Sequence, residues 1–313
     1  MRRWPGSVAL GASLILLATG SLVAALSTRF VSLLGGVFFI GVAFGGLDFL
    51  LNALLVRTDL DGRAHRLSVA NAGYGVGAVV GPLLIIGVRP GRFPWILAAI
   101  AVSSLLLTAS TRGLRAPPLR SSLHVRHGTH RRAVLTTFVG AYVLYVATEA
   151  SLSGWIAPQL HRIGYSQTIG SATTAGFWLG LAVGRFLAGP IHRRVNDRAL
   201  VLSGLSVTVL LCMLAQVDAL APFVYPLAGF SMALVYPMGL IWYTRLAPGD
   251  NDGIALMIFM MMSGGIIGPA VTSALVSAFG VHVVPISVSV FAIGDLAVFA
   301  SARRFQSRGE IVA

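Results

Sequence analysis

The chain contains the stretch Gly264-Gly265-Ile266-Ile267-Gly268-Pro269, and a matching stretch, Gly77-Ala78-Val79-Val80-Gly81-Pro82, lies much earlier. Both consist of two small residues, two branched apolar residues, a glycine and a proline, in the same order. The earlier copy lies in the third apolar run of the chain and the later copy in the ninth.

Copies that are six runs apart cross a membrane in the same direction, because six is an even number of crossings. Parallel repeats of six helices, related by an axis along the membrane normal, are typical of one large transporter architecture. The alternative is that the two glycine patterns are independent packing faces, which close helix contacts in membranes also favour.

The composition predicts that lipid surrounds most of the chain. Of the 313 residues, 56% are hydrophobic and 11% are charged, whereas soluble domains carry about a quarter charged residues. The apolar runs are about twenty residues long, which is enough for a helix to cross a hydrocarbon core of about 30 Å. They do not alternate with a period of two, as the strands of a membrane barrel do. We therefore predict an all-α integral membrane protein.

Ten apolar runs are candidate membrane spans, each bounded by Arg, Pro, Gly or Asp residues. They cover residues 8–27, 31–56, 67–88, 93–111, 133–157, 168–190, 199–217, 220–243, 253–278 and 282–301. The longest gap is rich in arginine and divides them into two groups. We predict an N-terminal bundle of four spans in residues 1–111, a basic cytoplasmic loop in residues 112–132 and a C-terminal bundle of six spans in residues 133–313.

All 23 basic residues are arginine, and their positions predict the direction of the spans. With a cytoplasmic N-terminus, 18 arginines lie in cytoplasmic gaps and four in the opposite gaps, with Arg185 near a cytoplasmic membrane edge. Positive residues concentrate on the cytoplasmic side of membrane proteins, so we expect a multi-pass protein of the cell membrane with both termini in the cytoplasm. The arginines are spread over many gaps, which argues against nucleic acid as a partner although the net charge is +13.

The repeat also predicts that part of the first half is missing. The pair Arg193-Arg194 precedes the seventh span and the pair Arg2-Arg3 precedes the first. Two spans stand before the arginine pair in the second half, and none does in the first. We expect a six-plus-six architecture that lacks its first two helices. A second copy of the chain or another membrane protein would complete the N-terminal bundle.

The stretch from Gly184 to Arg194 (GRFLAGPIHRR) resembles the conserved loop motif of the major facilitator superfamily, in its second-half copy. The resemblance implies a secondary transporter that works by alternating access. It also implies a cytoplasmic gate at Gly184, Arg185, Gly189, Arg193 and Arg194.

The stretch from Gly45 to Asn52 (GGLDFLLN) resembles the fucose permease group of sugar–proton symporters within that superfamily. In that group the fourth helix carries an acidic residue, followed four positions later by Asn and Pro. This chain has Asp48 for the usual Glu and Ala53 for the Pro. The stretch from His65 to Asn71 (HRLSVAN) also resembles that group.

Asp48 and Asn52 are candidates for binding a solute or a proton. They lie four residues apart in an apolar run, so they share one helix face. An ionisable group inside a span is costly and marks a functional site by default. A carboxylate in a medium of low dielectric constant can take up and release a proton near neutral pH, and the resemblance implies the same role. The alternative is a structural carboxylate that is hydrogen-bonded to a neighbouring helix.

Tyr142, Tyr145, Glu149 and Ser153 share one face of the fifth span. Phenols, a carboxylate and a hydroxyl on one face favour a wet cavity over lipid, so we predict binding of a solute or a proton at the first three. The alternative is that Glu149 pairs with an arginine or with backbone groups at the helix end.

Asn71 and Tyr74 begin the third run on nearly one face and are candidates for hydrogen bonds to a polar solute. Trp178, Tyr236 and Trp242 are candidates for stacking against it, with aromatic packing in the core as an equal alternative.

Several classes of protein are excluded. The sequence has no GxxxxGK[ST] pattern for nucleotides, no His/Cys cluster typical of a metal site and no Ser–His–Asp set within a span. We therefore expect no cofactor and no enzymatic activity, and we expect Asp295 to be a structural or peripheral group.

The favoured function is transport of a small solute, a sugar or a similar polar compound, coupled to protons as symport and carried out in contact with membrane lipid. Two alternatives stay open: export of amphipathic compounds by the same fold, and a truncated membrane protein that does not transport.

Overall fold

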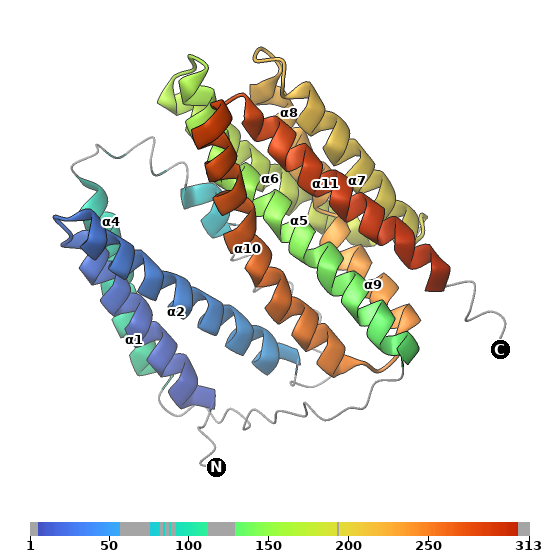
Figure 1. Ribbon diagram of the computed structural model, residues 1–313. Coiled ribbons are helices and arrows are strands. Elements are labelled where there is room, and N and C mark those ends of the chain that lie inside the picture. Colours follow the sequence, from blue (N-terminus) through green and yellow to red (C-terminus); the bar gives the residue numbers. More distant parts are fainter. Residues whose placement is uncertain are drawn as a thin grey trace. The chain divides into compact units, whose positions relative to one another are not determined.

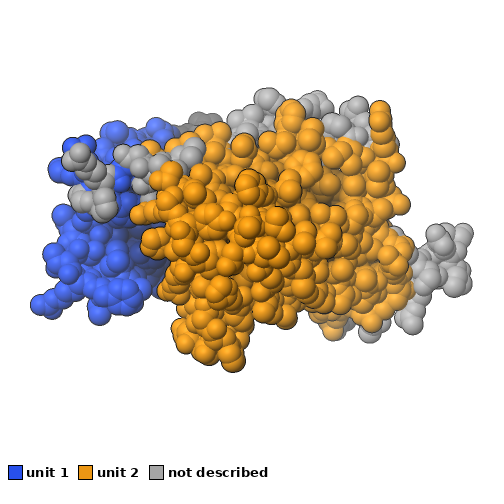
Figure 2. All heavy atoms as spheres, turned by 90° about the horizontal axis from the view of Figure 1, so that it is seen from above, with its two compact units in different colours: residues 1–74, 87–121 blue, residues 75–86, 122–313 orange. Residues whose placement is uncertain are grey.

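A computed structural model describes residues 6–56, 76–81, 84, 88, 92–111, 129–192 and 194–305. In these ranges every regular element is a helix (Figure 1), which confirms the predicted all-α fold. The chain forms two compact units, one of residues 1–74 and 87–121 and one of residues 75–86 and 122–313 (Figure 2).

The first unit contains α1 (Gly6–Ala25), α2 (Phe30–Val56) and α4 (Phe93–Ser110). α1 packs against both α2 and α4. A Cβ atom on Gly20 would lie 2.8 Å from the Ile40 nitrogen, and one on Gly36 would lie 2.6 Å from the Ala24 nitrogen. Glycine is therefore what lets the backbones of α1 and α2 meet, as is common where helices pack within membranes.

The second unit contains α5 (Thr129–Arg162), α6 (Gln167–His192), α7 (Asp197–Leu214), α8 (Ala221–Met232), α9 (Val235–Leu246), α10 (Asn251–Phe279), α11 (Val283–Ser301) and a 3₁₀ turn (Ala302–Phe305). α5 packs against α6, α10 and α11 (Figure 1). Phe138 and Tyr142 on α5, Trp242 on α9 and Phe299 on α11 are fully buried. Their rings meet in pairs with centroids 5.5–6.0 Å apart, so Trp242 belongs to the aromatic core.

The later copy of the repeated stretch lies in α10 and faces α5. A Cβ atom on Gly264 would overlap the Val143 carbonyl oxygen, and one on Gly268 would lie 2.7 Å from the Ala147 Cα. In this copy Gly264 and Gly268 are packing residues, as the alternative interpretation of the repeat states.

Eight helical segments among the described residues are long and apolar enough to cross a membrane. They cover 7–25, 30–47, 93–110, 130–162, 197–214, 221–246, 252–279 and 283–305. α6, with 26 residues, is also long enough at about 1.5 Å per residue. These helices correspond to nine of the ten predicted spans.

The third predicted span, residues 67–88, lies mostly outside the described residues. Residues 76–81 are helical. Among the described residues, a Cβ atom on Gly77 or Gly81 would meet nothing within 4 Å, so the close packing seen in the later copy is not observed there at these two glycines.

The eighth predicted span is interrupted. The sequence predicts one helix over residues 220–243, but α8 ends at Met232 and α9 begins at Val235. Pro237 has no N–H to donate to the Ala233 carbonyl, so one hydrogen bond of the helical ladder is missing here, although Ala233 and Leu234 keep right-handed helical dihedral angles. Proline is tolerated in the first turn of a helix, which is its place in α9.

Candidate functional site

Tyr142, Tyr145 and Glu149 lie on one face of α5, as their spacing predicts. Both tyrosines are almost completely buried, and the Glu149 side chain is 14% exposed. The face points into the second unit because α5 is surrounded there by α6, α10 and α11.

Arg185 reaches this face from α6. Its Nη2 atom lies 3.5 Å from Glu149 Oε2 and 3.5 Å from the Tyr145 hydroxyl, to which it donates a hydrogen bond. Its guanidinium carbon lies 5.9 Å from the centre of the Tyr236 ring, within the range of a cation–π interaction. The Arg185–Glu149 contact is the pairing with an arginine that the sequence leaves open as the alternative for Glu149, and the gate role of Arg185 stays a prediction.

Tyr236, in the first turn of α9, completes the group. Its ring stacks on Tyr145 with centroids 6.4 Å apart and meets Tyr142 edge to face at 5.5 Å. Its carbonyl oxygen accepts a hydrogen bond of 2.6 Å from the Tyr142 hydroxyl. Five predicted residues from three helices therefore lie together, and we name them the Arg185 cluster: Tyr142, Tyr145, Glu149, Arg185 and Tyr236.

Other predicted residues of the second unit lie apart from the cluster or have local partners. Trp178 lies two helical turns before Arg185, and its ring meets Phe177 at 5.6 Å. The Ser153 hydroxyl donates to the Ala150 carbonyl of its own helix at 3.2 Å.

The predicted gate residues are divided between helix and turn. Gly184 and Gly189 lie inside α6. A Cβ atom on Gly184 would lie 2.5 Å from the Ala233 Cβ, so this glycine packs against the segment that joins α8 to α9. Arg194 is exposed in the turn after α6, and Arg193 lies outside the described residues.

The candidates of the N-terminal part cannot be placed in the site. Asp48 and Asn52 belong to α2, but their side chains are outside the described part of the structure. Asn71 and Tyr74 also lie outside the described residues. Their roles stay predictions.

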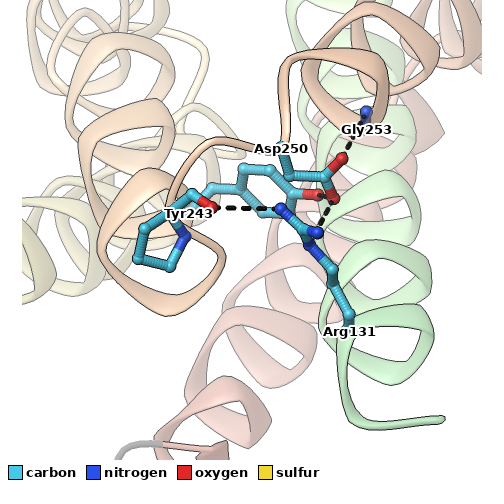
Figure 3. Close-up of polar contacts among 5 residues, drawn as sticks. Arg131, Tyr243, Asp250 and Gly253 are labelled. Carbon is cyan, nitrogen blue, oxygen red and sulfur yellow. Dashed lines mark hydrogen bonds and ion pairs between the residues drawn. The ribbon is translucent and has the colours of Figure 1, made fainter. Parts of the chain in front are cut away.

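A second polar cluster joins the start of α5, the end of α9 and the start of α10 (Figure 3). Asp250 is only 3% exposed and accepts hydrogen bonds from the Tyr243 hydroxyl at 2.7 Å and from the Gly253 nitrogen at 3.0 Å. Arg131 Nε lies 3.4 Å from the same carboxylate, and Arg131 Nη2 donates to the Pro248 carbonyl at 3.0 Å. This cluster holds three chain segments together at one end of the unit.

Sequence reasoning missed this cluster. Asp250 followed by Asn251-Asp252-Gly253 is a helix N-cap signal, which could have identified Asp250 as the cap of α10. Nothing in the sequence pairs it with Arg131, because the two residues are far apart along the chain.

Asp295 is more deeply buried than a peripheral group would be. It lies in α11 with no exposed surface, and neither carboxyl oxygen has a hydrogen-bond partner among the described residues. The described part of the chain also holds no group of His, Cys, Asp and Glu that could bind a metal ion.

Comparison with protein families finds no family model that matches the chain. Two curated relatives, each described as a glucose/galactose transporter, come from Brucella abortus biovar 1 (strain 9-941) and Brucella abortus (strain 2308). Each is 25% identical over 203 residues, which cover 61% of this chain and 48% of the relative. The chain thus matches about half the length of these curated relatives.

Solved structures share the fold across nearly the whole chain. A major facilitator superfamily transporter, FucP, in the outward conformation has a TM-score of 0.62 at 16% identity and matches over 96% of this chain and 83% of its own. A bacterial homologue of the human lysosomal transporter Spinster, inward-facing and occupied, has a TM-score of 0.75 at 15% identity, over 97% and 83%. The human organic anion transporter MFSD10 has a TM-score of 0.70 at 18% identity, over 94% and 77%. At these identities the likeness establishes the fold.

Proposed function

Because the chain has the fold of major facilitator superfamily transporters, we propose that it is a secondary carrier of a small polar solute. It moves a sugar or a similar polyhydroxy compound by alternating access, and a proton gradient drives the movement. The observation that carries this proposal is the Arg185 cluster, a pair of opposite charges enclosed by tyrosines within a helical bundle.

An ion pair in this position calls for a functional explanation. Taking two charges out of water costs several kcal/mol per ion, and their mutual attraction often fails to offset that cost. Apolar side chains would fill the same space with less risk to stability. Charged groups within membrane spans accordingly mark solute paths and proton relays.

The two charged side chains of the cluster are not fully buried. The Arg185 side chain is 27% exposed and the Glu149 side chain is 14% exposed, while the tyrosines behind them are buried or partly buried. Aromatic faces next to hydroxyl and charged groups suit a solute that has both apolar and polar faces. The two relatives described as glucose/galactose transporters support a polyhydroxy compound.

Glu149 is the residue to which we assign the coupling proton, because it is a carboxylate in the cluster with an exposed edge. The remaining parts of the proposal come from the sequence. They are the binding roles of Asp48, Asn52, Asn71 and Tyr74, the gate after α6, and a position in the cell membrane with cytoplasmic termini.

The test uses the full chain reconstituted in liposomes. The wild type should accumulate a labelled sugar or polyhydroxy compound when the outside is made acidic. The variant Glu149→Gln keeps the shape of the side chain without its charge, so it should still exchange internal for external solute but fail to accumulate it. Equal accumulation by both proteins would remove Glu149 from the coupling step. A wild type that neither exchanges nor accumulates any solute would favour a membrane protein that does not transport.

A further inference from the structure

We infer that the solute of the Arg185 cluster is a small carboxylate, which binds by taking the place of Glu149 on the Arg185 guanidinium. This inference rests on the proposed transport function and names the class of solute at the same site. A polyhydroxy carboxylate, such as a sugar acid, fits both the guanidinium and the tyrosine hydroxyls.

The first support is the length of the internal contacts. Arg185 Nη2 is 3.5 Å from Glu149 Oε2 and 3.5 Å from the Tyr145 hydroxyl. Charge-assisted hydrogen bonds between arginine and a carboxylate are typically about 2.7–2.9 Å long and are often made in parallel pairs. A mobile carboxylate that meets the guanidinium at such a distance would therefore bind it more closely than Glu149 does.

The second support is the way in which the guanidinium is held. Tyr236 lies against it at 5.9 Å from ring centre to guanidinium carbon, and the Tyr236 ring is itself fixed by stacking on Tyr145 and by the edge of Tyr142. This contact with the Tyr236 ring does not involve Glu149, so it can remain when Glu149 moves away. The Arg185 guanidinium would therefore stay in place while a solute carboxylate replaces Glu149.

The third support is the balance of charge. Without solute the cluster contains one positive and one negative charge, on Arg185 and Glu149. When a solute carboxylate binds Arg185, Glu149 loses its counter-charge in a largely buried position, and an isolated buried carboxylate is strongly disfavoured. Uptake of one proton from water by Glu149 restores one pair of charges. Each carboxylate therefore enters with one proton.

Two of the helices that pack against α5 bring few ionisable groups to it. The Tyr145 hydroxyl interacts with both Glu149 and Arg185. α10, which packs along α5, has no ionisable side chain between residues 253 and 279. On α11 the only carboxyl group is Asp295, which interacts with Tyr142.

The experiment measures binding of matched pairs of compounds to the purified full chain in detergent by calorimetry. The pairs are D-glucuronate and D-glucose, D-gluconate and sorbitol, and lactate and propane-1,2-diol, which differ only by a carboxylate in place of a CH₂OH group. We expect the carboxylate of at least one pair to bind at least about tenfold more tightly than its partner. Repeating the titration in buffers of different ionisation enthalpy should show one proton taken up for each carboxylate bound.

Three variants separate the roles of the two charges. Glu149→Gln should bind the carboxylate more tightly than the wild type, because the internal competitor is gone, and should take up no proton. Arg185→Gln should lose at least about tenfold in affinity. The double variant Arg185→Gln/Glu149→Gln removes both charges together, so neither remains buried and unpaired. It should fold normally and still fail to bind the carboxylate. Arg303→Gln, which removes an exposed arginine in the 3₁₀ turn Ala302–Phe305, should bind like the wild type.

Preference for the neutral member of every pair, binding of none of the six compounds, or carboxylate binding without proton uptake would overturn the inference. If a neutral sugar is nevertheless accumulated under a proton gradient, the proposed transport function stands and only the solute class is wrong. If no compound is transported, both fail.

Discussion

Gly264→Ala tests the packing of the second unit at one atom. A Cβ atom added there would overlap the Val143 carbonyl oxygen and lie 2.9 Å from the Ala147 nitrogen, whereas real Cβ atoms essentially never approach within 3.0 Å. The obstructing atoms belong to the backbone of α5, so no side chain can rotate away. α10 must therefore move back from α5 by roughly 1 Å, which breaks the close packing of the unit.

The expected loss follows from this clash. Overpacking costs about 1–3 kcal/mol, and a clash with backbone belongs at the upper end of that range. Alanine favours a helix over glycine by about 1 kcal/mol, which leaves a net loss of about 2 kcal/mol. For a bundle of this size that loss lowers the melting temperature by about 4–8 °C.

The assay uses Cys212, the only cysteine of the chain, which is fully buried in α7. A dye that becomes fluorescent on reaction with a thiol reports when heating exposes it. Gly265→Ala is the matched control, because its Cβ atom would meet only Val146 Cγ1, at an ordinary 3.6 Å. A Gly264→Ala protein that melts at or above the temperature of Gly265→Ala would refute the reasoning.

Three further predictions use the same chain. Asp250→Ala removes the hydrogen-bond acceptor of Tyr243 and the N-cap of α10. It should therefore lower the melting temperature more than Asp218→Ala, a change at an exposed site, does. Equal melting temperatures of the two variants would contradict this. Asp295→Leu replaces a buried carboxyl that has no hydrogen-bond partner among the described residues, so its melting temperature should equal or exceed that of the wild type, and a marked drop would show that the carboxyl has a stabilising partner. Asp48→Asn should abolish proton-coupled accumulation while the protein still inserts in the membrane, and normal accumulation would exclude Asp48 from the mechanism.

The sequence predicts most of the helices because lipid imposes a simple rule. A span needs about twenty apolar residues, and nine of the predicted runs coincide with helices within the described ranges. This rule does not predict the boundary between α8 and α9, which lies just before Tyr236. Pro226 lies in the same apolar run, and α8 continues through it, so the presence of a proline does not tell where a span is interrupted.

Part of the candidate site is also contained in the sequence. Helical spacing predicts that Tyr142, Tyr145 and Glu149 share a face, and α5 confirms it. The partner from α6 is less predictable: the sequence leaves open that Glu149 pairs with an arginine, but it does not single out Arg185, whose guanidinium meets Glu149 in the structure. The tilt of two helices and the faces on which they contact decide which residues meet. The spacing of residues along one helix predicts neither the tilt nor the contact face.

The measurement that tests the central claim most directly is solute accumulation in liposomes that contain only this chain. Under an inward proton gradient the internal concentration of the solute should rise above the external concentration, and a protonophore should abolish the difference. Accumulation that reaches but never exceeds the external concentration, or that is unaffected by the protonophore, would contradict the account of a proton-driven carrier.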